Sequence, residues 1–238
     1  MKLGQRLTQL NDMIPTGYTH IWDCCCDHGL LGAALLSRQA APTIHFVDIV
    51  PSLMQQLEDK LQRFYPRQFI PQWHVHCIDV AQIPLSDYPE TPLPETPLVV
   101  IAGVGGDLMI ELVNSICRNN PELQIDFMLC PVHHQYELRQ QLIKLECRLI
   151  DEKLLEENRR FYEILYVSRN KVDSAIATPL ATSPISPVGG KMWQCSSEAQ
   201  RDIAQRYLNK VLTHYQKISL SNPQKAAQAL QDYQTIFL

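Results

Sequence analysis

Seven short apolar segments, rich in β-branched and aromatic residues, recur between residues 20 and 168, and amphipathic stretches with helical spacing separate most of them. Strands that are apolar on both faces and are followed by helices are typical of a mainly parallel sheet covered by helices on both sides. The expected strands are residues 20–24, 43–49, 73–79, 98–103, 126–130, 147–156 and 161–168, and the clearest helices are residues 52–64, 107–119 and 135–146. This alternation predicts an α/β fold.

The segments that interrupt the alternation indicate how the chain is organised. Only the polar residues 156–160 separate the last two expected strands, which predicts an antiparallel hairpin at the edge of the sheet. Residues 80–97 contain five prolines and predict an irregular surface loop. Two amphipathic helices end the chain, the second beginning at Pro223. The expected organisation is an α/β domain over residues 1–170, a Pro/Ser-rich linker over residues 171–190 and a helical hairpin over residues 191–238.

The eight cysteines fit neither a disulfide framework nor a zinc motif, because three of them are adjacent at residues 24–26 and no CxxC pair occurs. His74, His76 and Cys77 share one expected strand, but strand alternation places Cys77 on the opposite face from the two histidines. The N-terminus has no apolar signal segment, and no apolar run is long enough to cross a membrane. The sequence predicts a cytoplasmic protein with reduced thiols, no membrane span and no metal.

The net charge of −4 is unevenly distributed along the chain. Residues 1–150 contain 10 Lys and Arg against 16 Asp and Glu, whereas the chain from Arg169 onward contains 8 basic and 4 acidic residues. A basic tail on an acidic body allows a polyanion to dock at one end. A solvated helical surface shows the same excess, so charge alone leaves both interpretations open.

Acidic residues follow the first three expected strands, where ligands bind in an open parallel sheet. Asp23 and Asp27 follow the first strand, Asp48 ends the second and Asp79 ends the third. The first loop lacks the GxGxxG pattern of a pyrophosphate site, and carboxylates repel phosphate. Carboxylates suit instead a nucleoside that carries positive charge and no phosphate, as S-adenosylmethionine does. The alternative interpretation is that Asp at strand ends is ordinary turn chemistry.

Two further loops carry candidate residues. The fourth strand leads through Ala102 into Gly103, Gly105, Gly106 and Asp107. Three glycines in four residues weaken a strand end, which indicates the close approach of a ligand or substrate. His133 and His134 follow the fifth strand, where one of them could act as an acid or base, although a pair of loop histidines is also ordinary surface.

The chain resembles the bacterial tRNA (adenine-N1)-methyltransferase family, which modifies an adenine in the D-arm of tRNA. The matching segments are residues 3–17, residues 23–28, residues 99–109 and residues 149–167. The resemblance implies a class I S-adenosylmethionine-dependent methyltransferase fold, with a Rossmann-like seven-stranded sheet that contains one antiparallel strand. It also implies S-adenosylmethionine as the cofactor and tRNA as the partner, docked through the basic C-terminal hairpin.

The resemblance also implies roles for individual residues. Asp23, Asp27 and His28 would line the methionine side of the cofactor, Asp48 would bind the ribose and Asp79 the adenine. The segment from Gly103 to Asp107 would border the target base, and Asp27 and Asp107 would stabilise the cationic product. The residues expected to contact the cofactor are Asp23, Cys25, Asp27, His28, Asp48, Ile49, Ile78, Asp79, Ala102, Gly103 and Gly105.

Three departures from the family pattern mark a divergent member. Cys25 stands where the family usually has glycine, and Ile49-Val50-Pro51 lacks the usual Lys-Gly step. Cys130-Pro131-Val132-His133 stands where the family has Gln-Pro-Asn. Two other functions remain open at this stage, namely a methyltransferase of a small molecule or protein and a noncatalytic relative that kept the fold.

Overall fold

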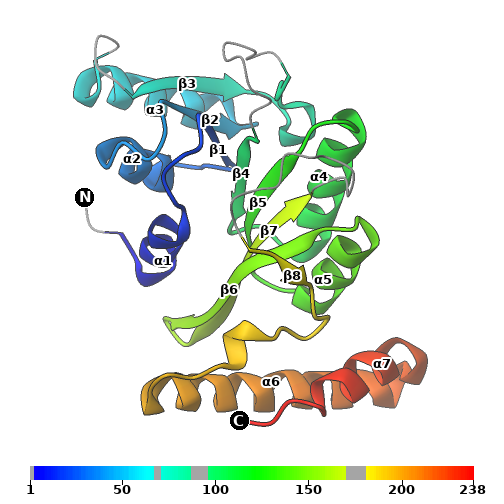
Figure 1. Cartoon of the computed structure of the whole chain (residues 1–238). Coiled ribbons are helices and arrows are strands. Elements are labelled where there is room, and N and C mark those ends of the chain that lie inside the picture. The colour runs from blue at the N-terminus through cyan, green and yellow to red at the C-terminus, as the bar shows by residue number, and fades with distance from the viewer. Residues whose placement is uncertain (1–2, 67–70, 87–95, 170–180) are drawn as a thin grey trace.

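An eight-stranded mixed sheet forms the centre of the molecule in the computed structural model, which describes residues 3–66, 71–86, 96–169 and 181–238 (Figure 1). The order of strands across the sheet is β3-β2-β1-β4-β5-β7-β6-β8. The strands are β1 (His20–Cys24), β2 (Thr43–Asp48), β3 (Gln72–Cys77), β4 (Leu98–Ala102), β5 (Ile125–Cys130), β6 (Arg148–Glu157), β7 (Arg160–Arg169) and β8 (Ser183–Pro184). The first five are parallel, whereas β7 is antiparallel to β5 and β6, and β8 is antiparallel to β6.

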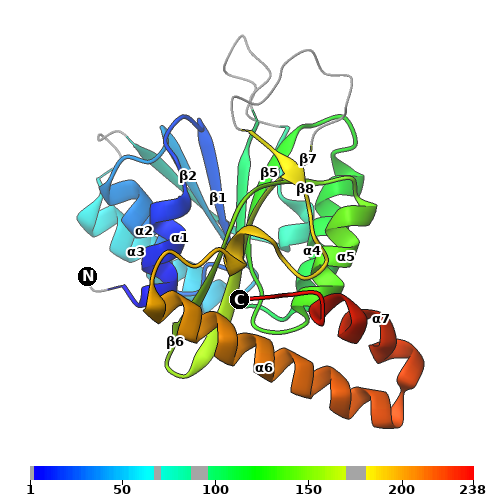
Figure 2. The ribbon, with the colours of Figure 1, turned by 60° about the horizontal axis from the view of Figure 1, so that its bottom comes forward.

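Helices cover both faces of this sheet, as the alternating pattern predicts. In Figure 2, α1, α2 and α3 lie on one side of the strands, and α4 and α5 lie on the other. The helices are α1 (Gln5–Met13), α2 (Leu30–Ser37), α3 (Pro51–Phe64), α4 (Gly106–Asn119), α5 (Gln135–Lys144), α6 (Glu198–Ser221) and α7 (Pro223–Tyr233), with short 3-10 turns η1 (Val80–Gln82) and η2 (Lys191–Trp193). None of these described helices is both long enough and apolar enough to cross a membrane.

The strands are apolar on both faces because two separate cores flank the sheet. Within β4, Leu98 and Val100 belong to the core on the α1–α3 side, whereas Val99 and Ile101 belong to the core on the α4–α5 side. All four of these side chains are completely buried. The period-2 alternation thus fills both layers, which is the arrangement of a covered parallel sheet.

The sheet has eight strands and not the expected seven, and two of them run against the others. The extra strand, β8, lies in the segment expected as a linker. Residues 171–180 of that segment lie outside the described residues, but residues 181–190 pack on the sheet, with Ile185 and Val188 buried. The expected edge hairpin forms through a two-residue turn at Asn158 and Arg159, both with positive φ.

The expected surface loop at residues 80–97 is partly wrong. Val80, Ile83 and Leu85 are buried in the core on the α4 side, because η1 packs against α4. Residues 87–95 lie outside the described residues, so the expectation of an irregular loop there stays a prediction.

The C-terminal helices share a third core with the end of the β6–β7 hairpin. This core joins Tyr207 and Tyr215 of α6 to Tyr233 of α7, Trp193 of η2 and the partly buried Phe161 of β7. In Figure 1, α6 and α7 cross one end of the molecule beside β6. The helical hairpin is therefore packed on the α/β domain through the buried side chains of α6 and α7.

A buried ionic group, which we call the buried junction, ties these parts together and consists of Arg139, Glu152, Glu163 and Tyr207. The Arg139 guanidinium is completely buried and donates to Glu152 Oε2 at 2.6 Å and to Glu163 Oε2 at 2.8 Å. Tyr207 of α6 donates to Glu163 Oε1 at 2.6 Å. Because α5, β6, β7 and α6 each contribute one member, the hairpin cannot leave without exposing a charged pair.

Candidate active site

The strand order reverses between β1 and β4, and this switch point places the loops after β1, β2 and β4 at one edge of the sheet. From β1 the chain moves outward to β2 and β3, then returns to the other side of β1 as β4. Cys24 at the end of β1 lies in register with Val47 of β2 and Ile101 of β4. Ligands of open α/β sheets bind in the crevice at such a point.

The loop after β1 has an unusual backbone. Cys25, Asp27 and Gly29 have φ angles of 54°, 50° and 67°, so three alternate residues adopt the left-handed conformation. Only Gly29 does so without a steric penalty, which explains why the family usually has glycine at the position of Cys25. Strained residues held in this way cluster at functional sites.

The acidic residues of the first three strand ends gather around the Cys25 thiol. Burial, together with the charges of Asp48, Asp23 and Asp79, raises the pKa of this thiol to about 11. Asp48 accepts hydrogen bonds from the amides of Asp27 at 3.1 Å and Val50 at 3.2 Å, so its carboxylate joins the β1 and β2 loops. The structure thus brings together the carboxylates that the sequence placed at separate strand ends.

Asp23 lies deeper than the other carboxylates of this group. It is 4% exposed, and its Oδ2 accepts a hydrogen bond of 2.8 Å from the Gly32 amide in the first turn of α2. Burial raises the pKa of Asp23 to about 7, although the Gly32 hydrogen bond opposes this shift. Through its hydrogen bond to the Gly32 amide, the buried Asp23 side chain joins the end of β1 to the start of α2.

The remaining expected cofactor residues lie on the surface of the same edge. Asp27 and His28 side chains are 66% and 53% exposed and lie 3.7 Å apart. Ile49 is 66% exposed, Ile78 is half-buried, and Asp79 accepts a hydrogen bond of 2.9 Å from the Ala81 amide. These side chains therefore form a rim along the strand-end edge of the sheet.

The glycine-rich loop after β4 packs closely against the loop after β5. A Cβ atom at Gly105 would lie 2.7 Å from His133 Nε2, and one at Gly106 would lie 2.6 Å from the His133 carbonyl oxygen. The Gly106 amide donates to that oxygen at 3.0 Å. The neighbouring histidine loop is thus the reason for two of the three glycines, which the sequence had attributed to a ligand. Gly103, with φ of 90°, remains exposed beyond Ala102.

Asp107 begins α4 and is held by the same histidine loop. Its Oδ1 lies 2.8 Å from His134 Nδ1, and both side chains are exposed. His134 has positive φ and precedes α5. Asp107 and Asp27, the two candidate catalytic carboxylates, thus lie on separate loops of the same strand-end edge.

Arg6 of α1 is a functional candidate that the sequence interpretation did not single out. Its Nη1 atom is buried without a hydrogen-bond partner among the described residues and lies 3.2 Å from the position of a Cβ on Gly103. The guanidinium lies 5.3 Å from the Tyr162 ring centre. A charged donor aimed at a strand end without a partner is suited to a ligand anion. Arg6 lies within the family-like segment 3–17, but only folding brings it beside β4.

Four histidines lie outside this edge, on the α4-side face of β1, β2 and β3. His45 Nε2 and Nδ1 are 2.9 and 3.0 Å from ring nitrogens of His20 and His76, and its ring stacks on Trp22. Burial, together with the neighbouring histidines, lowers the pKa of His45 to about 2. Among the described residues, no group of three or more His, Cys, Asp or Glu side chains is arranged to hold a metal ion. All eight cysteines are free thiols.

Comparisons with known proteins agree with this geometry. A family model for a methyltransferase domain matches residues 3–165, which is more than half of the chain. No curated protein sequence matches.

Among solved structures, TrmK of M. capricolum in complex with S-adenosyl-homocysteine is 16% identical over 99% of this chain and 97% of its own, with a TM-score of 0.72. The B. subtilis M1A22 tRNA methyltransferase TrmK is 20% identical over 98% and 95%, with a TM-score of 0.69. Streptococcus pneumoniae Sp1610 in complex with S-adenosyl-L-methionine is 16% identical over 98% and 99%, with a TM-score of 0.70.

These likenesses in structure establish the fold, and the Rossmann-like class I methyltransferase architecture is confirmed, with eight strands in place of seven. The strand-end crevice, its acidic rim and the family match over residues 3–165 lead to one conclusion: the chain belongs to the methyltransferase domain family.

Proposed function

We propose that this protein is an S-adenosylmethionine-dependent tRNA (adenine-N1)-methyltransferase that modifies an adenine in the D-arm. The observation that carries the proposal is that the likeness to the two TrmK structures extends over 98% or more of this chain, including α6 and α7. A general methyltransferase domain would account for residues 3–165 alone. The cytoplasm, where tRNA is modified, is the proposed location.

The residues of the crevice fit S-adenosylmethionine, whose sulfonium carries the methyl group to be transferred. The carboxylates around Cys25 suit its positive charge, and Asp48 is placed at the end of β2 to accept hydrogen bonds from ribose hydroxyls. The α-carboxylate of S-adenosylmethionine requires a cation, and the acidic rim does not offer one. The buried and unpartnered Arg6 Nη1, beside Gly103, supplies that cation.

The chemistry required of the protein is mainly alignment. N1 of neutral adenine already has a nucleophilic lone pair, so no general base is needed before attack, and holding N1 in line with the methyl group lowers the barrier. S-adenosylmethionine, when bound, would supply the methyl group; its transfer to N1 would release S-adenosyl-homocysteine and leave the base positively charged. The exposed carboxylates of Asp27 and Asp107 border this position and stabilise the new charge. Because N1 lies on the Watson–Crick edge, a paired target must first be flipped out.

The C-terminal hairpin is proposed to hold the tRNA through its basic side chains. Arg201, Lys210 and Lys217 of α6 are exposed. Arg206 pairs with Glu156 at 2.7 Å, and Lys191 donates to the Ile150 carbonyl at 2.6 Å. Both side chains are therefore already engaged in contacts within the protein. Because α6 and α7 complete the third core, deleting residues 191–238 would test stability as much as RNA binding. Point substitutions are the sharper tool.

The function is tested by incubating the protein with an unmodified tRNA transcript and methyl-labelled S-adenosylmethionine, followed by nucleoside analysis. We expect label in 1-methyladenosine. Saturable cofactor binding without any transfer to tRNA would favour a small-molecule or protein substrate. A folded protein that does not bind the cofactor would indicate a noncatalytic relative.

The Asp27→Asn variant tests the role of the exposed carboxylate in this assay. Asparagine keeps the shape and tolerates the positive φ of 50°, so the fold should be unchanged. Loss of the charge should lower kcat roughly tenfold, or about 1.4 kcal/mol in barrier. Asp59→Asn on the exposed side of α3 is the matched control. A wild-type kcat for Asp27→Asn would remove Asp27 from the mechanism.

A further inference from the structure

A hollow of about 230 Å³ lies between the loop after β5, the start of β7 and the C-terminal helices. Its aromatic lining comes from Tyr136, Phe161, Tyr207, Tyr215 and Tyr233. The rings form two contacting groups: Phe161 lies 5.4 Å from Tyr207, while Tyr136, Tyr215 and Tyr233 lie within about 6 Å of one another. Tyr136, Tyr207, Tyr215 and Tyr233 are buried in the third core, so the accessible ring of the lining is that of the half-buried Phe161. Accessible aromatic rings are the surfaces on which nucleobases stack.

The polar part of the lining is cationic or neutral. His133, His134, Lys210 and His214 contribute to it, and all four side chains are exposed. Lys210 Nζ lies 5.4 Å from the centre of the Phe161 ring. No carboxylate lines the hollow among the described residues, although the chain as a whole carries a net charge of −4. The lining therefore complements an anion that is attached to an aromatic ring.

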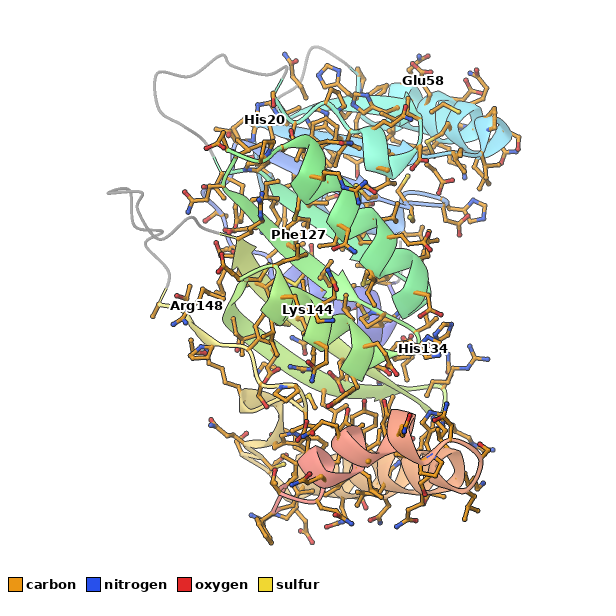
Figure 3. All side chains as sticks on the ribbon, turned by 90° about the vertical axis from the view of Figure 1, so that its right-hand side faces the viewer. His20, Glu58, Phe127, His134, Lys144 and Arg148 are labelled. Atoms are coloured by element: carbon orange, nitrogen blue, oxygen red, sulfur yellow. The ribbon has the colours of Figure 1, made fainter. Side chains whose placement is uncertain are left out.

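The hollow shares a wall with the glycine-rich loop of the active site. Gly106 N donates to His133 O at 3.0 Å, and His134 Nδ1 lies 2.8 Å from the candidate catalytic Asp107. In Figure 3, His134 lies at the side of the α/β domain nearer to the C-terminal helices. The same two histidines thus contact the active-site loop and line the hollow.

We propose that this hollow binds one unpaired nucleotide of the tRNA next to the adenine that is methylated, and this proposal rests on the proposed function. The base stacks on the half-buried Phe161 ring, and its phosphate is bound by Lys210 and His214. Because flipping the target adenine breaks its stacking with its neighbours, a second site that receives a neighbouring base keeps the strand open. The histidine loop, which touches both sites, couples them.

Val211→Phe separates binding in the hollow from general attraction of RNA to the hairpin, and Lys210→Ala tests the phosphate contact. Val211→Phe fills the hollow with a ring and leaves every charge in place, since Val211 is a half-buried lining residue of α6. Lys210→Ala removes the cation that would bind the phosphate. Lys60→Ala, an exposed lysine of α3 at the opposite end of the molecule (Figure 1), is the matched control for lost charge.

The affinity of the full-length variants for an unmodified tRNA transcript is measured across a salt series, together with their affinity for S-adenosylmethionine. We expect Val211→Phe to raise the Kd for tRNA roughly tenfold by excluding one stacked base, with its salt slope unchanged. Lys210→Ala should reduce that slope by about one. Neither should change the Kd for S-adenosylmethionine, and Lys60→Ala should match wild type.

Wild-type tRNA affinity for Val211→Phe would overturn the proposal and leave only diffuse attraction by the hairpin. His214→Ala, at an exposed position, provides a second test if Val211→Phe does not fold, and its tRNA Kd should also rise; no rise would again overturn the proposal. Methyl transfer by the wild-type protein is measured in parallel. If no methyl reaches tRNA, the proposed function fails, whereas the tRNA Kd of the variants still reports on the hollow.

Discussion

The carboxylates of the strand-end rim (Asp27, Asp48, Asp79 and Asp107) and those of the buried junction lie in opposite environments. In the rim, the Asp27 and Asp107 side chains are 66% and 69% exposed, and their protein partners are a few backbone amides and histidines. In the junction, Glu152 is completely buried and bonds to Arg139 and to the Gly190 and Met192 amides. Burial by itself would raise the pKa of Glu152, but Arg139 and these amides lower that pKa below its ordinary value.

This contrast separates acidic residues that maintain the fold from acidic residues that can serve a ligand. A buried carboxylate must be paired with a cation and hydrogen-bonded, so its charge is already used within the protein. A rim carboxylate keeps its charge available to a cationic molecule that enters the crevice. Arg139 and Arg6 show the same division among the cations: Arg139 is fully paired, whereas Arg6 Nη1 finds no partner among the described residues.

The largest expected effect comes from breaking the buried junction. Arg139→Leu leaves Glu152 and Glu163 buried without their cation, which should lower the free energy of unfolding by about 3–5 kcal/mol. Urea unfolding followed by circular dichroism measures this loss. Arg148→Leu, an exposed arginine at the start of β6, is the matched control and should change stability by less than about 0.5 kcal/mol.

A difference of less than about 1 kcal/mol between Arg139→Leu and wild type would refute the structural role of the junction. If Arg139→Leu does not fold, Tyr207→Phe tests the same contact more gently. It removes the donor to Glu163 Oε1 and should cost about 1–3 kcal/mol.

The second prediction uses His45, whose completely buried ring contacts those of His20 and His76. The pKa of His45 is about 2 in the folded protein against an ordinary value of 6.5, so below pH 6.5 the unfolded chain binds a proton that the folded chain excludes. Stability should therefore fall with decreasing pH below 6.5, by about 1.4 kcal/mol per pH unit from this group. Urea unfolding at pH 7.5, 6.0 and about 5.0 measures the slope.

His45→Phe is the control for this pH dependence, because it keeps a ring against Trp22 and cannot titrate. Its stability curve should be flatter between pH 6.5 and about 5.0 than that of the wild type. Parallel curves for the two proteins would show that His45 carries none of the pH dependence.

The smallest effect on stability, and the one that tests the rim, is expected for Asp48→Ala. Loss of a charged acceptor of two ribose hydroxyls should weaken S-adenosylmethionine binding by about 1.5–3 kcal/mol. The free energy of unfolding should change by less than about 1 kcal/mol, because water can replace the carboxylate at the half-exposed Asp27 and Val50 amides. Titration calorimetry measures the cofactor affinity of Asp48→Ala, with Asp59→Ala as the control. Unchanged cofactor affinity for Asp48→Ala would rule out Asp48 as the ribose ligand.

Most elements of the α/β domain could be predicted from periodicity, because the spacing of apolar residues within each strand or helix identifies the face that is buried. The strand expected at 98–103 corresponds to β4 at Leu98–Ala102, and the helix expected at 52–64 corresponds to α3 at Pro51–Phe64. Within the expected linker, the Pro and Ser content gave no sign that Ile185 and Val188 are buried in two of the cores. Composition over a window does not report single anchoring residues.

The site was predictable where its residues follow strands directly. Asp48 and Asp79 both act on the Cys25 thiol because parallel strands end at one edge of the sheet, and that rule needs no coordinates. Arg6 was not predictable in its role, because helical spacing in α1 identifies the apolar stripe but not which strand end the opposite face reaches. The hollow beneath α6 was hidden for the same reason, since Phe161, Lys210 and His133 are far apart in the chain.

The sequence by itself determined the alternation of strands and helices, the acidic chemistry of the strand ends and the two amphipathic helices at the C-terminus. The tertiary structure alone decided that β7 lies between β5 and β6, that Arg6 faces Gly103, and that Arg139 binds α6 to the domain through Glu163 and Tyr207. Local patterns show which faces of an element must be buried. Which of several apolar faces pair, and which charges meet between them, depends on packing between segments that are distant in the chain.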